Sequence, residues 1–269
     1  MKYDGHVKLT KKAIEKLKNS CPISTGICNA PMFDNARRVW LGDDDKSNAT
    51  DNYSAAIFNY ISHSITPDII KQATLPDVVA FVDLKERWTH EHPDGQRYHF
   101  MRAPKESNLQ AYENGVKFIK AHTEKWVEMS IKAVEHDVKE NKPLQNATWK
   151  NTRAYIWELA LALHALQDSF SPGHVKRIGA IKLTSPHSGI TDAVAPISGL
   201  YVYTEQDHDK HGEHDYGSGS PDSEWGATAV NASIALMSVG ILSIAQKNKN
   251  LVGWEQFKFK WLMSSFKIN

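Results

Sequence analysis

Three residues of metal-binding type fall close together in the stretch ELALALHALQDSFSPGHVKR. His164 and Asp168 are four positions apart, so on a helix they project from one face, one turn apart. Pro172 stops the helix and Gly173 lets the chain bend, which can bring His174 back toward the same point. Imidazole and carboxylate are ligands that suit zinc. Alone, the first pair is more typical of a hydrogen bond than of a metal site, and the third residue favours the metal.

The spacing H-x3-D-x5-H, with a proline two residues before the last histidine, resembles the central ligand motif of the zinc-dependent phospholipase C family. Fungal single-strand nucleases share this motif. In that family the segment reads H-x-x-G-D-x-x-x-P-x-H. Here it is HALQDSFSPGH, so Gln167 replaces the glycine while the ligand spacing is intact. The resemblance implies one mostly helical domain around three clustered zinc ions.

The resemblance also implies ligands elsewhere in the chain. The family has a histidine at the start of its first helix, which His6 in DGHVKLTKKAIEKL matches. An aspartate follows, for which LPDVVAFVDL offers Asp77, and then a histidine before an aromatic residue, which is His99 in RYHFM. Ordinary roles would be a solvated helix start for His6, a helix N-cap for Asp77 and a half-buried histidine for His99. The residues that compete for the second and third positions are Asp83, His90 and His92.

The family closes its ligand set with H-x3-E or H-x3-D, and the stretch EQDHDKHGEHDYGSGSPDSEW has His211 and Asp215 at that spacing. A tract so rich in histidine and aspartate is metal-binding by composition. It offers further candidates in His208, Glu213 and His214. The family also binds zinc through its mature N-terminus, usually a tryptophan. Met1 stands there in this chain, and Asp4 could supply an oxygen instead.

By resemblance, the ligands divide among three zinc ions. The first ion is held by Asp77, His99, His164 and Asp168. The second is held by His174, His211 and Asp215. The third is held by His6 and the bridging Asp168. Asp77 is also placed to act as general base. Such a cluster suits phosphodiester hydrolysis, because adjacent cations neutralise developing negative charge and lower the pKa of a bound water.

The elements that must position these residues are mostly helical. Apolar residues at helical spacing predict an all-α domain of about eight helices, over 9–18, 53–64, 67–73, 77–84, 109–138, 149–170, 224–246 and 254–266. Asp222 or Ser223 is expected to cap the seventh helix. Residues 199–205 are the best strand candidate, as one half of a small hairpin. Long loops are expected over 20–51, 85–107 and 176–223, and loops of this length are often functional.

Size and charge set further bounds. The 269 residues are 41% hydrophobic, enough for the core of one large domain over 1–269. A net charge of +1 exerts no long-range pull toward nucleic acid or an anionic membrane.

We expect no membrane span, and we expect residues 229–246 to form a buried core helix. No secretory signal is visible in the first residues, although a leader could have been removed. Cys21 and Cys28 could form a local disulfide or remain two thiols.

The near-neutral net charge disfavours a nucleic-acid substrate. The segment ALHALQDSFSPGHV also resembles the bacterial phospholipases more than the fungal nucleases. We therefore expect a phospholipase C that cleaves phosphatidylcholine-type lipid to diacylglycerol and a phosphorylated head group. A single-strand nuclease of the same fold is the alternative. A helical protein with structural zinc is a second alternative. Lipid at a membrane surface, or nucleic acid outside the cell, implies a secreted protein, whose leader has been removed or which is exported without a cleaved signal.

Overall fold

The computed structural model describes residues 3–19, 93–140, 153–179, 194–205, 213–214 and 218–266. This part of the chain is mostly helical, as the hydrophobic pattern predicts. The helices expected over 53–64, 67–73 and 77–84 lie outside the described residues, and so does 149–152, the expected start of the following helix.

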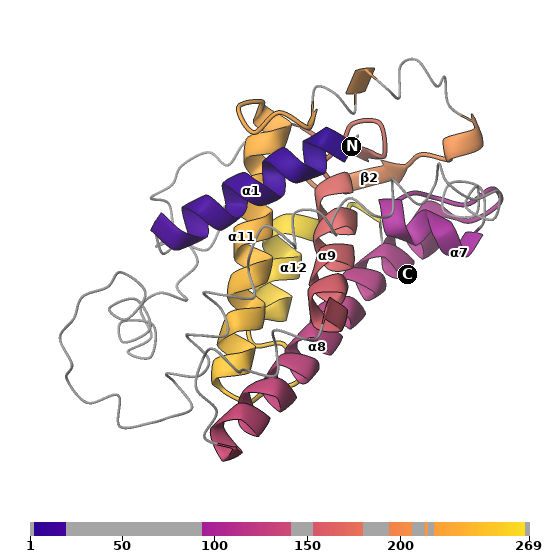
Figure 1. Cartoon of the computed structure of the whole chain (residues 1–269). Helices are drawn as coiled ribbons and strands as arrows, with labels where there is room; N and C mark the ends of the chain where they lie inside the picture. The colour runs from indigo at the N-terminus through magenta and orange to yellow at the C-terminus, as the bar shows by residue number, and fades with distance from the viewer. Residues whose placement is uncertain are drawn as a thin grey trace.

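Three helices form the centre of the fold: α8 (Asn108–Lys139), α9 (Arg153–Asp168) and α11 (Glu224–Ala245). Each contacts the other two, and α9 lies between α8 and α11 (Figure 1). From Leu159 to Phe170 every residue of α9 and its exit is buried. This part of α9 therefore lies in the core, and the polar side chains within it are removed from water.

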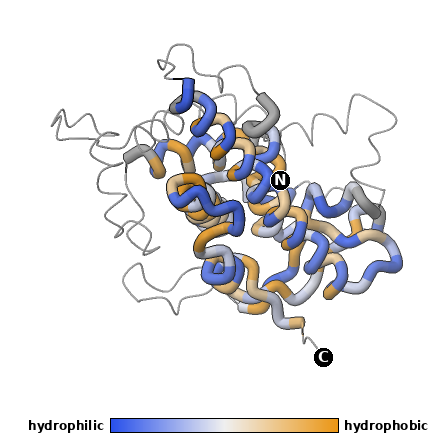
Figure 2. Tube along the Cα trace, turned by 90° about the horizontal axis from the view of Figure 1, so that it is seen from below, coloured by the Kyte–Doolittle hydropathy of each residue, from blue (hydrophilic) through white to orange (hydrophobic). Residues whose placement is uncertain are grey.

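Shorter elements cover the end of α9 at which it meets the N-terminus of the chain (Figure 1). Helix α1 (Tyr3–Asn19) contacts both α11 and α9. Helix α7 (Pro93–Gln96) leads into the 3-10 turn η3 (Arg97–His99), which contacts α8 and α9. Helix α12 (Trp254–Leu262) packs against α11. Several helical tubes mix hydrophobic and hydrophilic positions, as expected for helices that bury one side (Figure 2).

Helix α11 is buried along most of its length. By length and composition it is the one helix in the described part of the chain that could cross a membrane, but 89% of its apolar window is buried inside the protein. Its serines do not disrupt it, because Ser233 and Ser238 each donate to the carbonyl four residues earlier at 2.8 Å. The Ser223 hydroxyl caps the helix by accepting from the Gly226 amide at 3.0 Å. The expected core helix and one of its two expected caps are thus present.

Two of the expected boundaries are wrong because of strand pairing. The strand expected at 199–205 is β2 (Ile197–Leu200), which pairs antiparallel with β1 (Val175–Arg177), and Tyr203–Glu205 is a 3-10 turn. The last helix ends at Leu262 rather than 266. Residues beyond it bind β2 instead: the Ile197 amide donates to the Met263 carbonyl and the Ser265 amide to the Ile197 carbonyl, both at 2.8 Å.

Two other expectations change through local structure. The first helix begins at Tyr3 rather than at residue 9, so that His6 lies within it. The loop expected over 85–107 contains α7 and η3, and the loop over 176–223 contains β2. Both loops therefore contribute ordered backbone next to the end of α9 (Figure 1).

Candidate metal centre

The predicted ligands that the structure describes all lie around the carboxylate of Asp168, at the end of α9. His164 and Asp168 come from α9, His6 from α1, His99 from η3 and His174 from the turn after α9. All five side chains are buried, with His174 the most exposed at 3%. These five predicted positions are therefore brought together by the fold.

Three ligand-type atoms form an equilateral triangle. His164 Nε2 and His99 Nδ1 are 3.2 Å apart, and each lies 3.2 Å from Asp168 Oδ2. Hydrogen bonds can account for at most two of these three contacts, because an imidazole nitrogen either donates or accepts but cannot do both. In a tetrahedral zinc site with bonds of about 2.0–2.1 Å, neighbouring ligand atoms lie roughly 3.3–3.4 Å apart. The triangle therefore fits one face of a zinc coordination tetrahedron.

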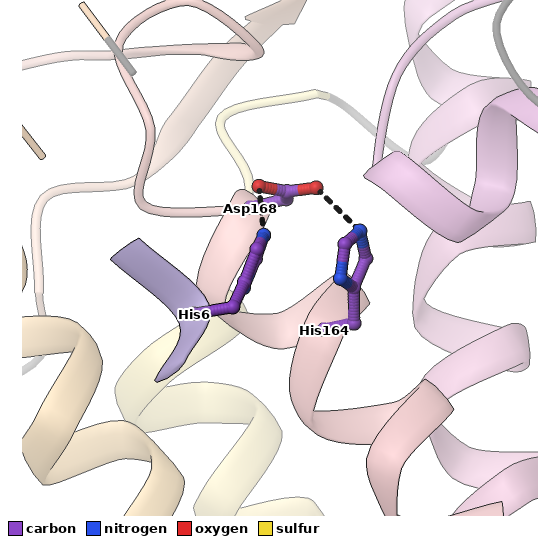
Figure 3. Close-up of side chains that lie close together, drawn as sticks. All are labelled: His6, His164 and Asp168. Atoms are coloured by element: carbon purple, nitrogen blue, oxygen red, sulfur yellow. Dashed lines mark ion pairs between the residues drawn. The ribbon is translucent and has the colours of Figure 1, made fainter. Parts of the chain in front are cut away.

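His6 approaches the other oxygen of the same carboxylate. Its Nε2 atom lies 3.3 Å from Asp168 Oδ1, and its ring stacks on that of His164 with centroids 3.9 Å apart. Figure 3 shows the carboxylate between the two imidazoles, with one oxygen facing each ring. Ligand atoms of His6, His164 and Asp168 all lie within 4.8 Å of one another. A carboxylate that divides its oxygens in this way could bridge two cations.

The electrostatics of the cluster favour an ionised carboxylate. Burial alone would raise the pKa of Asp168, but the imidazoles of His174, His6 and His164 hold it well below its usual range. A deprotonated aspartate surrounded by imidazoles is the state that binds a divalent cation. The donor set and its charge thus suit zinc.

His174 is oriented by a backbone carbonyl. Its Nδ1 atom lies 2.7 Å from the carbonyl oxygen of His99 and 3.6 Å from Asp168 Oδ2. A carbonyl can only accept, so Nδ1 carries the hydrogen, and in the neutral ring Nε2 keeps the lone pair. Metal-binding histidines commonly have one ring nitrogen held in this way.

The turn that returns His174 to the cluster is held by its own backbone and by Arg177. The amides of His174 and Val175 both donate to the Ser171 carbonyl at 3.0 Å. The buried Arg177 guanidinium stacks on Phe170, with 4.6 Å to the ring centroid. It donates to the carbonyls of Ser169, Ala195 and Trp261. Arg177 therefore joins the end of α9 to the small sheet and to α12.

His99 is held in place by the residue that follows it. Phe100 is fully buried and adopts a left-handed backbone conformation, with φ at 50°. Its ring lies against Gly115 of α8, where a Cβ atom would come within 2.7 Å of the ring. The absence of a side chain at Gly115 thus lets α8 approach the turn that carries His99.

Gln167, which stands where the motif has a glycine, also contacts the cluster. Its Oε1 atom lies 2.7 Å from His6 Nδ1. The sequence does not assign it a role, because the residues that surround it come from α1 and α11. The signal that could have found it is its position directly before Asp168, in the stretch of α9 from Leu159 onward whose other residues besides His164 and Asp168 are apolar.

A second polar cluster lies between α8 and α9 and was not predicted. The buried carboxylate of Glu158 contacts His122 Nδ1 and Lys125 Nζ, both at 2.5 Å. Burial lowers the pKa of His122, and the hydrogen bond to Glu158 opposes this by raising it. Glu158 of α9 thus contacts two residues of α8, and we interpret the cluster as an ion-paired link between these two core helices.

Most of the remaining candidate ligands lie outside the part of the chain that the structure describes. Asp77, His211 and Asp215 lie outside the described residues, as do Met1, His208 and the two cysteines. So do the competing candidates Asp83, His90 and His92. Glu213 and His214 are described and are exposed.

Comparisons with family models, with curated proteins and with solved structures found no match to this chain. The assignment of a function therefore depends on the sequence motif and on the geometry around Asp168.

Proposed function

We propose that the chain is a zinc-dependent phosphodiester hydrolase of the phospholipase C type, with about eight helices around a cluster of three zinc ions. Its substrate would be phosphatidylcholine-type lipid, cleaved to diacylglycerol and a phosphorylated head group. The protein would act on a membrane surface after export from the cell.

The observation that carries the proposal is that the two oxygens of the Asp168 carboxylate face different histidines. Oδ2 forms the 3.2 Å triangle with His99 and His164, while Oδ1 lies 3.3 Å from His6. A single buried carboxylate with imidazoles on both oxygens is suited to bridging two adjacent cations. Adjacent cations are a recurrent arrangement in enzymes that hydrolyse phosphodiesters.

In this proposal each residue has a defined part. His99, His164 and Asp168 would hold one zinc together with Asp77, and His6 with Asp168 would hold another. His174, presented by the His99 carbonyl, would hold a third with His211 and Asp215. When bound, the ions would neutralise charge that develops on the phosphodiester and lower the pKa of the attacking water. Asp77 would accept the proton of that water as general base.

The choice of lipid over nucleic acid depends on the sequence. The chain has nearly equal numbers of basic and acidic residues, 32 and 31, whereas tracking a nucleic-acid backbone favours a basic surface. The motif HALQDSFSPGH resembles the bacterial phospholipases more than the nucleases. Both substrates place the same phosphodiester at the metal cluster.

The proposal is tested by metal analysis together with turnover. Purified protein would be loaded with zinc and assayed on phosphatidylcholine vesicles, on a chromogenic phosphocholine ester and on single-stranded DNA, with and without chelator. We expect three zinc ions per chain and chelator-sensitive cleavage of the two phosphocholine substrates. His164→Ala and Asp168→Ala should each abolish turnover, whereas His136→Ala, an exposed histidine of α8, should not.

Each other outcome is informative. Cleavage of single-stranded DNA alone would replace the phospholipase by a nuclease of the same metal chemistry. Bound zinc without turnover on any substrate would indicate structural zinc in a helical protein. Fewer than two bound ions would contradict the proposed cluster.

A further inference from the structure

Gln167 connects three helices at the metal centre. It lies on α9 between His164 and Asp168 and is fully buried. Its Oε1 atom lies 2.7 Å from His6 Nδ1 on α1. Its Nε2 atom donates to Thr10 Oγ1 on α1 at 3.0 Å and to Ser233 Oγ on α11 at 3.2 Å. The side-chain amide thus uses its oxygen and both of its hydrogens within the core.

The hydroxyl of Ser233 determines which way this amide points. Ser233 donates its only hydrogen to the carbonyl of Ala229 at 2.8 Å, so toward Gln167 its oxygen can only accept. The amide nitrogen must therefore face Ser233, and the amide oxygen must face His6. A flipped amide would place an oxygen against the Ser233 oxygen, with no hydrogen between them.

The orientation of Gln167 in turn determines the tautomer of His6. Two acceptors face the ring, the Gln167 amide oxygen 2.7 Å from Nδ1 and the Asp168 carboxylate 3.3 Å from Nε2. The shorter contact is the hydrogen bond, so the hydrogen of the neutral imidazole lies on Nδ1. The lone pair is then on Nε2, the atom that lies 3.3 Å from Asp168 Oδ1. This chain of contacts runs from Ser233 through Gln167 to the face of His6 that a metal would use.

We propose that Gln167 is a positioning residue that holds His6 as the Nδ1–H tautomer and directs its Nε2 atom toward the cation site shared with Asp168. Its effect on metal binding rests on the proposed function, whereas its effect on the tautomer does not. Neither glutamate nor leucine could replace it fully. A glutamate at this position could not donate to Thr10 and Ser233, and a leucine could not accept from His6.

The first test reads the tautomer in metal-free protein. Two-dimensional NMR of histidine labelled with nitrogen-15 distinguishes Nδ1–H from Nε2–H by its long-range couplings, at one pH where the ring is neutral. We expect His6 to be the Nδ1–H tautomer in the wild type and to become a mixture, or the Nε2–H form, in Gln167→Leu. An unchanged Nδ1–H signal in Gln167→Leu would overturn the proposal.

A matched pair of serines separates this role from general packing. Ser233 and Ser238 are both buried on α11 and both donate to the carbonyl four residues earlier, but only Ser233 accepts from Gln167. Ser233→Ala should broaden or shift the His6 nitrogen signals, and Ser238→Ala should leave them unchanged. Equal effects of the two variants would show that only packing is involved.

The second test measures metal affinity. We expect Gln167→Leu to lower the affinity for one zinc ion by about 10–100-fold, the usual effect of removing a group that orients a ligand. His6→Ala should lower the affinity for the same ion, and the affinities for the ions held by other residues should not change. Wild-type affinity for every ion in Gln167→Leu would overturn the metal part of the proposal. A wild type that binds no zinc would instead refute the proposed function, and the tautomer measurement would still decide the role of Gln167.

The conservative variants keep the proposal testable if Gln167→Leu does not fold. Thr10→Val and Ser233→Ala each remove one acceptor of the Gln167 amide and leave its carbonyl in place. Ser233→Ala should shift His6 toward a mixture of tautomers and lower the affinity for the same ion, by less than Gln167→Leu. Thr10→Val, in which Ser233 still orients the amide, should have the smaller effect of the two. Normal tautomer and normal affinity in both variants would overturn the proposal.

Discussion

His99 Nδ1 and His164 Nε2 lie 3.2 Å apart although the residues are separated by 65 positions in the chain. Each nitrogen is also 3.2 Å from Asp168 Oδ2. Two atoms of this triangle come from one face of α9, and the third comes from η3. The geometry of the candidate metal centre thus depends on how η3 docks against α9.

The contribution of η3 can be tested by removing its imidazole. His99→Ala should lower zinc affinity by more than about 100-fold, because even groups that only orient a ligand contribute about 10–100-fold. Metal content after gel filtration and isothermal titration would measure this. His136→Ala is the control, since this histidine lies on the exposed side of α8. Full zinc content in His99→Ala would remove His99 from the ligand set.

Metal removal should destabilise the protein. An ion that binds only the folded state, present at 100 times its Kd, stabilises that state by about 2.7 kcal/mol. Chelator should therefore lower the Tm of the zinc-loaded wild type in thermal unfolding followed by circular dichroism. Asp168→Ala, which lacks the shared carboxylate, should unfold at nearly the same temperature with and without chelator. A wild-type Tm that does not respond to chelator would contradict a buried metal cluster.

The contact between α8 and α11 requires a glycine. A Cβ atom at Gly240 would lie 1.9 Å from Cζ3 of Trp126, a side chain that is 2% exposed. Overpacking a core typically costs about 1–3 kcal/mol, and the gain of about 1 kcal/mol in helix propensity from alanine offsets only part of it. We expect Gly240→Ala to lower the free energy of unfolding in urea denaturation.

A double-mutant cycle identifies the cause. In a Trp126→Leu background the space around position 240 is larger, so Gly240→Ala should cost much less there than in the wild type. An equal cost in both backgrounds would show that Trp126 is not the group that excludes a side chain.

The cluster of His122 and Glu158 should make stability depend on pH. Burial lowers the folded-state pKa of His122 below about 6.5, so between the two pKa values the unfolded state binds more protons. This contribution to the free energy of unfolding is complete above about pH 6.5 and is lost as the pH falls toward the folded-state pKa. Urea denaturation between pH 5 and pH 8 would measure it, and His122→Gln should remove this contribution.

Removing the carboxylate should shift the same titration. Glu158 raises the pKa of His122 against the effect of burial, so Glu158→Gln should lower that pKa further. An NMR titration of the His122 ring protons would show the change. A higher pKa in Glu158→Gln would contradict the ion pair seen in the structure.

Arg177 should be irreplaceable by lysine. Its guanidinium donates to carbonyls at the end of α9, before β2 and in α12, and a buried carbonyl left without its donor costs roughly 1–3 kcal/mol. Arg177→Lys keeps the charge but cannot reach all three carbonyls, so it should lower the free energy of unfolding in urea. The neighbouring exposed Lys176 is the control, and Lys176→Ala should change stability little. Equal stability of Arg177→Lys and wild type would contradict the role of Arg177 in joining these elements.

Helix existence and the order of ligands along α9 were predictable from local rules. Apolar spacing predicts α8 to within one residue at each end, because its pattern is long and uninterrupted. The end of α12 was not predictable, since its last residues pair with β2 rather than continue the helix. Helical spacing carries no information about a strand far away in the sequence.

The sequence by itself determined that His164 and Asp168 share a face and that the chain after Pro172 can return His174, because helix geometry and proline stereochemistry act within a few residues. The family resemblance pointed to His6 and His99, but it did not indicate which nitrogen of each ring faces the site or which residues each ring contacts. Only the tertiary structure decided that Asp168 divides its oxygens between His6 and the pair His99 and His164, and that Gln167 orients His6. Apart from the His164–Asp168 contact within α9, these contacts join residues 69 or more positions apart along the chain, and the packing of α1, η3 and α11 against α9 creates them.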